Sequence, residues 1–191
     1  MDVLLRAVIF HIFIGSLSGY SQKQTTDRGT LGELMKALNT TDPVWLLKRT
    51  YTRENHTCVY SKMISLTNTE YEFMQYFMDN VNMRSEHLYA RLSMTNDNPP
   101  GAQMTVRKNK GAGPGITYLL VHWESDNHCG ILYFEQTDKE GKKVYECEAY
   151  TWNQNVDKIE ECLRWYENYC SSYKHTEQTV YTKECQEHPG C

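Results

Sequence analysis

The chain has 191 residues, a formal net charge of −4 and no run of basic residues, so we set nucleic-acid binding aside. Aromatic residues make up 12% of the chain and include 14 tyrosines, which favours β-structure or a ligand pocket. The length predicts one domain, because about 170 residues remain once the N-terminal segment is removed.

The first 19 residues have the features of a secretory signal peptide. Arg6 supplies a positive charge, Ala7–Leu17 is an apolar run, and small residues follow it, so we expect cleavage between Ser18 and Gln24. The alternative is a buried N-terminal helix. The run is too short to cross a bilayer, which takes about 20 apolar residues, and no later segment is apolar enough. We therefore predict a secreted, extracellular protein without a membrane span, whose mature domain covers residues 25–191.

Cysteines and sequons agree with secretion. In a secreted chain, cysteines indicate a disulfide framework, and an odd number leaves a thiol that is free or paired with another chain. The sequons Asn39-Thr40-Thr41 and Asn55-His56-Thr57 predict two glycosylated asparagines at the surface. The seven cysteines are Cys58, Cys129, Cys147, Cys162, Cys170, Cys185 and Cys191.

One short amphipathic helix opens the domain. Thr30 and Glu33 form a capping box, in which each side chain can bond a free amide at the helix start. Apolar residues follow at helical spacing until about Asn39, and Pro43 blocks any continuation. The apolar positions are Leu31, Leu34, Met35 and Leu38.

From Val44 to Trp152 the pattern becomes that of β-strands. Apolar and β-branched runs are separated by turn residues, and the short connections indicate antiparallel, up-and-down order. After Trp152 the spacing is again helical, and residues 176–183 could add a short strand. The eight candidate strands are Val44–Tyr51, Cys58–Leu66, Tyr71–Met78, Leu88–Met94, Gln103–Val106, Ile116–Trp123, Gly130–Gln136 and Lys143–Thr151.

This order of elements predicts a mainly β fold. It fits an eight-stranded antiparallel up-and-down barrel of the lipocalin type, with a short N-terminal helix and a C-terminal helix packed outside. Such a barrel has an interior wide enough for one small ligand. The strand count also fits a β-sandwich without a cavity.

Several short motifs carry a resemblance to a known family. Trp45 follows Asp42-Pro43-Val44 at the start of the first strand. Sixteen residues separate Cys129-Gly130-Ile131 from Glu148-Ala149-Tyr150, and eleven residues separate Tyr150 from Cys162. This frame resembles that of the tick salivary lipocalins, the histamine-binding-protein family, which includes a japanin-like branch. The resemblance implies a small-molecule carrier that performs no chemical step and needs no cofactor.

The resemblance also implies a ligand site and a set of disulfides. Trp45 would form the barrel floor, Leu34 and Met35 would cover or line it, and the barrel wall would contribute further side chains. Family disulfides imply the pairs Cys58–Cys185, Cys129–Cys162 and Cys147–Cys191. Cys170 would then be the odd cysteine of a monomer, or the bridge of a dimer. The wall residues are Tyr71, Phe73, Phe77, Glu148 and Tyr150.

Departures from the family frame bear on the ligand. Gly130 stands where an amine-binding member has Asp, and Ala149 stands where it has Leu. A protonated amine taken out of water needs a carboxylate partner, so losing one acid favours an apolar ligand such as a sterol, a fatty acid or an eicosanoid. The aromatic strand Tyr71–Met78 suits such a ligand, although it could equally be ordinary core beneath the helix. If the chain is similar to the japanin-like branch, the resemblance also implies that it acts on host dendritic cells.

Two other functions remain open. An amine scavenger for histamine or serotonin would use Asp42, Glu148 and Glu135 as counter-charges. A protein-binding immune modulator would contact a host immune-cell receptor or complement factor through Asn98–Gly101 and Gly111–Gly115. No esterase, metalloprotease or nucleotide-binding motif occurs, so we predict no catalytic residue, no metal site and no enzyme activity.

Overall fold

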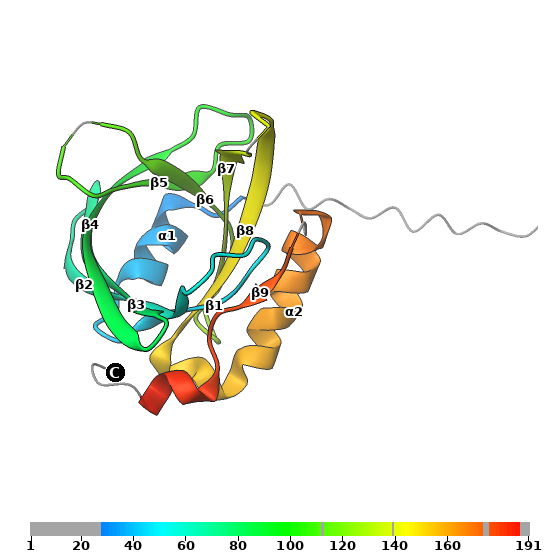
Figure 1. The fold of residues 1–191 in the computed structure, drawn as a ribbon. Helices are drawn as coiled ribbons and strands as arrows, with labels where there is room; N and C mark the ends of the chain where they lie inside the picture. Colours follow the sequence, from blue (N-terminus) through cyan, green and yellow to red (C-terminus); the bar gives the residue numbers. More distant parts are fainter. Residues whose placement is uncertain (1–27, 112, 139, 174–175, 188–191) are drawn as a thin grey trace, which may run out of the picture.

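A computed structural model describes residues 28–111, 113–138, 140–173 and 176–187 of the chain (Figure 1). The predicted signal peptide and Cys191 lie outside the described residues. No helix within the described ranges combines the length and the apolar character needed to cross a membrane.

The predicted barrel is confirmed. Each strand pairs antiparallel with the next along the chain, and β8 pairs with β1, so the sheet closes on itself. A closed sheet with antiparallel neighbours leaves no exposed edge and encloses an interior. The strands are β1 Val44–Arg49, β2 Thr57–Leu66, β3 Glu70–Asp79, β4 Asn82–Met94, β5 Ala102–Arg107, β6 Ile116–Glu124, β7 Cys129–Thr137 and β8 Lys143–Trp152.

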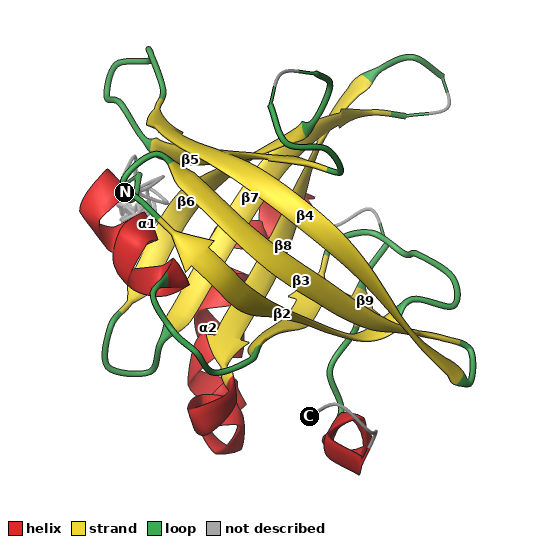
Figure 2. Cartoon of the chain, turned by 90° about the vertical axis from the view of Figure 1, so that its left-hand side faces the viewer, coloured by secondary structure: helices red, strands yellow, loops and turns green. Residues whose placement is uncertain are grey.

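Helix α1 (Leu31–Leu38) lies across one end of the barrel (Figures 1 and 2). It begins at the predicted capping box, where the Glu33 amide donates to Thr30 Oγ1 at 3.2 Å and the Thr30 amide donates to Glu33 Oε2 at 2.7 Å. Leu34 and Leu38 are buried against the inner residues of the barrel. The helix therefore closes this end with apolar side chains.

The segment before α1 fastens the helix to the barrel. The Gly29 amide donates to the Leu120 carbonyl, and the Ala102 amide donates to the Gly29 carbonyl, both at 2.8 Å. There is no room for a side chain here, because a Cβ on Gly29 would lie 2.5 Å from Leu120 Cδ2. The glycine therefore lets the chain pass tightly between β5 and β6.

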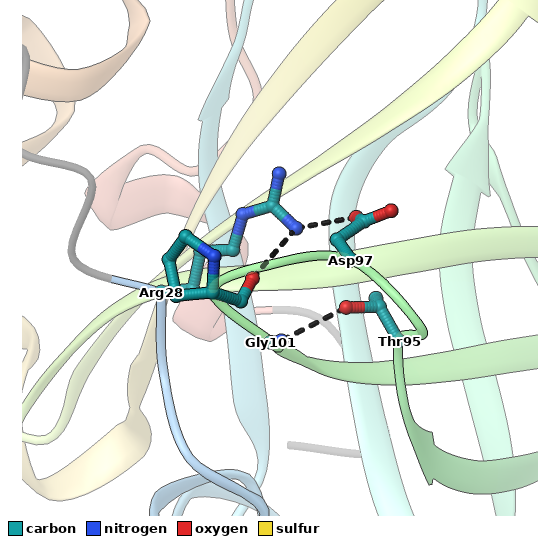
Figure 3. A network of polar contacts seen from close by, with 5 residues as sticks. Arg28, Thr95, Asp97 and Gly101 are labelled. Atoms are coloured by element: carbon teal, nitrogen blue, oxygen red, sulfur yellow. Dashed lines mark hydrogen bonds and ion pairs between the residues drawn. The ribbon is translucent and has the colours of Figure 1, made fainter.

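Arg28 extends this attachment to the loop between β4 and β5 (Figure 3). Its guanidinium forms an ion pair with Asp97 and donates to the Pro99 carbonyl at 3.4 Å. The same loop is held by the Gly101 amide, which donates to Thr95 Oγ1 at 2.9 Å. These contacts join the N-terminal segment to the end of the barrel that α1 covers.

A second helix covers one side of the barrel from outside. A 3-10 helix at Asn153–Lys158 leads into α2 (Ile159–Cys170), which packs against β7, β8 and β1 (Figure 1). The chain then passes through a 3-10 turn at Ser171–Tyr173, the short strand β9 (Gln178–Thr179) beside β1, and a last 3-10 helix at Lys183–Glu187. The wall formed by β3 and β4 faces the viewer in Figure 2 without a helix over it.

The disulfides correct one of the expected pairings. Cys58–Cys185 and Cys129–Cys162 are present, as the resemblance implies. Cys147, however, pairs with Cys170 and not with Cys191, at a Cα–Cα distance of 5.6 Å. The reason is that Cys147 lies on the outer face of β8, beneath the last turn of α2, where Cys170 is fully buried. Cys170 is therefore not the odd cysteine, and the predicted dimer bridge through it is wrong.

Candidate ligand-binding site

The barrel encloses a cavity of about 340 Å³. It runs from α1 to the loop between β5 and β6 at the other end, and its volume lies within the usual range of roughly 300–1,000 Å³ for small-molecule sites. Most of its walls are apolar. The apolar side chains that line it include Leu34, Leu38, Phe73, Leu88, Leu120 and Leu132.

Two tryptophans lie at the end of the cavity next to α1, with their ring centroids 5.9 Å apart. Trp152 Nε1 donates to the Ala37 carbonyl at 3.0 Å, which fixes this indole against the helix. The Trp123 indole nitrogen is buried and has no hydrogen-bond partner among the described residues. At this end of the cavity, the Trp152 N–H is thus hydrogen-bonded, whereas the Trp123 N–H has no acceptor among the described residues.

Sequence reasoning missed Trp123 because β6 is not regular. Tyr118 and Leu120 line the cavity, so strict alternation would turn Trp123 to the outer face. The pairing of β6 with β7 shifts between Leu120 and His122, and the extra residue of such a bulge reverses the facing of the side chains beyond it. Trp123 therefore points inward, next to Gly130, where an added Cβ would meet Trp123 Cε3 at 3.7 Å.

The opposite end of the cavity is the mouth, and it is positively charged. Arg53, Arg107 and Lys108 line it, and Glu86 is the one acid among the lining residues that the structure describes. Lys108 Nζ lies 3.0 Å from Glu86 Oε1 and so neutralises it, and Arg107 Nε donates to the Gly113 carbonyl at 2.8 Å. The two arginines leave the mouth with a net positive charge.

Glu148 lies inside the barrel wall and is only 2% exposed. Its carboxylate accepts hydrogen bonds from the Tyr150 hydroxyl at 2.5 Å and from the Tyr51 hydroxyl. Burial raises the pKa of Glu148, whereas the two phenol bonds and the charge of Arg49 act against that rise. Burial and the nearby carboxylate also raise the pKa of Tyr118, which keeps this cavity-lining phenol protonated at neutral pH. Glu148 itself does not line the cavity.

Four of the residues predicted to bind ligand line the cavity: Leu34, Tyr71, Phe73 and Tyr150. Met35 packs against the same apolar cluster without lining the cavity. The Tyr71 and Phe73 rings stack with centroids 4.7 Å apart, and they also contribute to the core beneath α1. The interpretations of this strand as cavity wall and as core therefore both apply.

Trp45 lies away from the cavity. It is fully buried on the outer side of β1, with its ring 4.7 Å from that of Tyr60 and 5.0 Å from that of Tyr181, and its Nε1 donates to Asn153 Oδ1 at 2.9 Å. Phe77 likewise does not line the cavity and stacks on His56 at 4.2 Å. Trp45 packs the C-terminal tail against the barrel through Tyr181, and Phe77 packs the loop between β1 and β2 against it through His56.

The other residues predicted to bind an amine are also separate from the cavity. Glu135 is on the outer face of β7, where it pairs with Lys143 at 2.7 Å, and Asp42 precedes β1 without lining the cavity. Asn39 and Asn55 are both exposed, and Asn55 adopts a left-handed conformation with φ of 53°. Within the described ranges, no three His, Cys, Asp or Glu side chains are grouped so that they could hold a metal ion.

Comparison with protein-family models identifies a family that matches most of the chain. The model of the family described as tick histamine binding protein matches residues 22–187. No protein of curated function is significantly similar to the chain in sequence.

Comparison of the folds finds several solved barrels. Japanin from Rhipicephalus appendiculatus, bound to cholesterol, has 14% identity and a TM-score of 0.50, over 78% of this chain and 98% of that one. The AM182 serotonin complex has 12% identity and a TM-score of 0.54, over 80% and 91%. Insecticyanin from the tobacco hornworm Manduca sexta has 10% identity and a TM-score of 0.51, over 78% and 81%. At such identities the similarity establishes the shared fold alone.

Proposed function

The chain belongs to the tick histamine-binding protein family, and on that premise we propose that it is a secreted salivary lipocalin that holds a small apolar ligand in its barrel. The ligand would be a sterol such as cholesterol, a fatty acid or an eicosanoid. By removing or delivering this ligand, the protein would modulate host immune or inflammatory responses, with dendritic cells as one target. The cholesterol held by japanin, a barrel of the same fold, supports this class of ligand.

The observation that carries the proposal is the chemistry of the cavity wall. Its walls are mainly apolar, and the single acid among the described lining residues, Glu86, is paired with Lys108. A protonated amine in the cavity would therefore have no unpaired carboxylate as a partner. Moving the amine out of water without such a partner costs on the order of several kcal/mol, the penalty for burying an unpaired ion. An apolar ligand gains about 25 cal/mol for each Å² that it buries.

Glu148 supports a second candidate, the binding of histamine or serotonin. It is a buried acid in the barrel wall, it stands in the family frame, and the fold neighbour AM182 holds serotonin. Glu148 does not line the cavity, whereas Tyr150, which bonds its carboxylate, does, so an amine in the cavity would have to move Tyr150 aside to reach the acid. This rearrangement makes the amine the weaker candidate.

Native mass spectrometry of the secreted protein, followed by lipid extraction, tests the proposal. We expect a sterol or lipid to co-purify, and the delipidated protein to take up cholesterol or a fatty acid at micromolar concentration or below. An unrelated secreted protein from the same cells gives the background. Binding of histamine or serotonin in that concentration range, with no uptake of sterol or lipid, would show that the protein is an amine scavenger.

A further inference from the structure

Two arginines at the mouth of the cavity have no acidic partner. Arg53, in the loop between β1 and β2, and Arg107, the last residue of β5, both line the cavity. Among the residues that the structure describes, no acid forms an ion pair with either of them, whereas Lys108 at the same mouth is paired with Glu86. The chain as a whole has a formal net charge of −4, so the mouth is opposite in sign to the rest of the protein.

Backbone contacts hold the part of the chain that carries Arg53. Its amide donates to Gln178 Oε1 at 3.0 Å, and its carbonyl accepts from Arg49 Nη2 at 3.2 Å. Arg49 is only 1% exposed and also donates to the His56 carbonyl at 3.0 Å. Arg53 Cζ lies 6.0 Å from the centroid of the Phe77 ring. The loop between β1 and β2 therefore holds the Arg53 charge at the barrel and not far out in solvent.

Arg107 is fastened through one of its nitrogens. Its Nε donates to the Gly113 carbonyl at 2.8 Å, which joins the guanidinium to the loop between β5 and β6. The other four N–H groups of an arginine are on its two terminal nitrogens, in a planar arrangement that matches the two oxygens of a carboxylate. The bond to Gly113 therefore positions this guanidinium and leaves its carboxylate-binding edge for another partner.

The charge of Arg53 also acts inside the barrel. Burial and the Glu148 carboxylate raise the pKa of Tyr118, a residue of the cavity wall, and the charges of Arg53 and Arg49 act against that rise. Burial and the same two arginines lower the pKa of His56. Because the rest of the lining is mainly apolar, a ligand in the cavity meets uncompensated positive charge at the mouth.

We infer that the ligand is an amphiphile with a carboxylate at one end, held at the mouth by Arg53 and Arg107 while its hydrocarbon chain fills the apolar interior. The inference rests on the proposed function and narrows its ligand to the fatty acids and eicosanoids, because cholesterol has no acidic group. At the mouth a carboxylate keeps part of its hydration, so it avoids the full cost of burying an ion. Its hydrogen bonds with arginine are charge-assisted, which makes them stronger than neutral ones.

The length of the cavity suits a chain that runs inward from this head group. On β6 the lining extends from Ile116, at the mouth, to Trp123, at the end next to α1. An extended hydrocarbon chain can therefore follow this strand over most of its length, and it gains free energy for all of the apolar area that it buries.

The first measurement compares three molecules that share one hydrocarbon chain: palmitic acid, hexadecanol and hexadecylamine. Each is titrated into the delipidated protein against a neutral fluorescent reporter, and its dissociation constant is measured. We expect the acid to bind about tenfold more tightly than the alcohol, because it adds charge-assisted bonds, and the amine to bind most weakly, because the mouth repels it. An alcohol or an amine that binds as tightly as the acid would overturn the inference, and uptake of the alcohol would leave the proposed apolar carrier intact.

The second measurement assigns the effect to the two arginines. Arg53→Gln and Arg107→Gln should each weaken palmitic acid roughly 3- to 10-fold and leave hexadecanol unchanged, so that the double variant binds both nearly alike. Arg164→Gln is the matched control, since it removes the same charge from an exposed position on α2, outside the barrel. A ratio of acid to alcohol affinity that is the same in wild type and in the double variant would overturn the inference.

A third measurement needs only the wild-type protein. Raising the ionic strength from low to physiological should weaken palmitic acid and not hexadecanol, because salt screens charge pairs at a solvent-accessible mouth. Acid binding that does not respond to salt would contradict the pairing with arginine. Failure of palmitic acid, hexadecanol and cholesterol alike to bind would overturn the proposed function, and the inference with it.

Discussion

The Tyr150 hydroxyl donates a 2.5 Å hydrogen bond to Glu148 Oε2, and the two residues lie two positions apart on the inward face of β8. Tyr150 lines the cavity and Glu148 does not. The Tyr150 side chain therefore lines the cavity while its hydroxyl is bonded to the Glu148 carboxylate. This arrangement keeps an ionisable group inside the wall of a cavity whose lining is mainly apolar.

We predict that Glu148 makes stability depend on pH. Burial raises its pKa above the ordinary value of 4.5, so the folded protein holds this proton more tightly than the unfolded chain does. The contribution of Glu148 is therefore greatest below pH 4.5, and it is lost as the pH rises through the folded-state pKa. Urea unfolding of wild type and Glu148→Gln should be compared from below pH 4.5 upwards. We expect the free energy of unfolding of wild type to fall relative to that of the variant as the pH rises. A difference that is constant with pH would contradict the prediction.

His56 should have the opposite effect. Burial, together with the charges of Arg53 and Arg49, lowers its pKa from 6.5 to about 4, and its ring stacks on Phe77. Its contribution to stability is therefore present above pH 6.5 and is lost as the pH falls through about 4. In unfolding experiments, His56→Phe should keep the stack and remove about 3 kcal/mol of this acid sensitivity. The substitution leaves the sequon at Asn55 intact.

A carboxylate at position 130 should change the ligand preference. Because a Cβ fits there at ordinary contact distance from Trp123, we expect Gly130→Asp to fold. The new acid would supply a counter-charge in the cavity, and histamine or serotonin should bind roughly 10- to 100-fold more tightly than to wild type. Gly130→Asn, which has the same shape without the charge, is the matched control in calorimetric titrations. A gain of similar size in both variants would show that shape, and not charge, is responsible.

The corrected disulfide leads to a prediction about two cysteines. Cys147–Cys170 closes a loop with a sequence separation of 23 residues, so Cys170→Ala should lower the free energy of unfolding by about 3 kcal/mol. Cys191→Ser should leave it nearly unchanged. Peptide mapping without reduction should recover a peptide that joins Cys147 to Cys170. A peptide that joins Cys147 to Cys191 would show that the pairing implied by the family is the true one.

Gly29 and Gly32 form a contrasting pair close together in the chain. A Cβ on Gly29 would overlap Leu120, so Gly29→Ala should cost about 1–3 kcal/mol and disturb the cavity that Leu120 lines. A Cβ on Gly32 would meet only Thr30 Oγ1, at 3.9 Å, and Gly32 lies within α1. Gly32→Ala should therefore stabilise the protein by about 0.5–1 kcal/mol. Thermal unfolding of the two variants distinguishes these effects.

The barrel could be predicted from sequence because its strands are separated by strong turn residues. Seven of the eight strands begin within two residues of the expected position, and β4 is the exception, since it begins at Asn82 and not at Leu88. Its first residues, up to His87, are mostly polar and exposed, so no alternation marks them. They are strand because they pair with the end of β3 across a turn at Asn80, which has φ of 53°. Pairing of this kind depends on the partner and not on the local pattern.

The facing of individual side chains was harder to predict. Leu88, Ala90 and Leu92 alternate and are buried on one face, as their pattern indicates. Trp123 and Trp45 could not be placed in this way. Trp123 lies beyond a bulge, and Trp45 is buried beneath the C-terminal tail, a contact between segments far apart in the chain. One inserted residue or one distant neighbour is enough to reverse a side chain.

The three disulfides are all on one side of the molecule. They join β2, β7 and β8 to α2 and to the last 3-10 helix, and within the described residues none reaches β3, β4, β5 or β6. Those four strands contribute most of the strand residues that line the cavity. Substitutions in these four strands can therefore change the lining of the cavity while the cross-linked half preserves the fold. The shape of the cavity and the stability of the barrel thus depend largely on different strands.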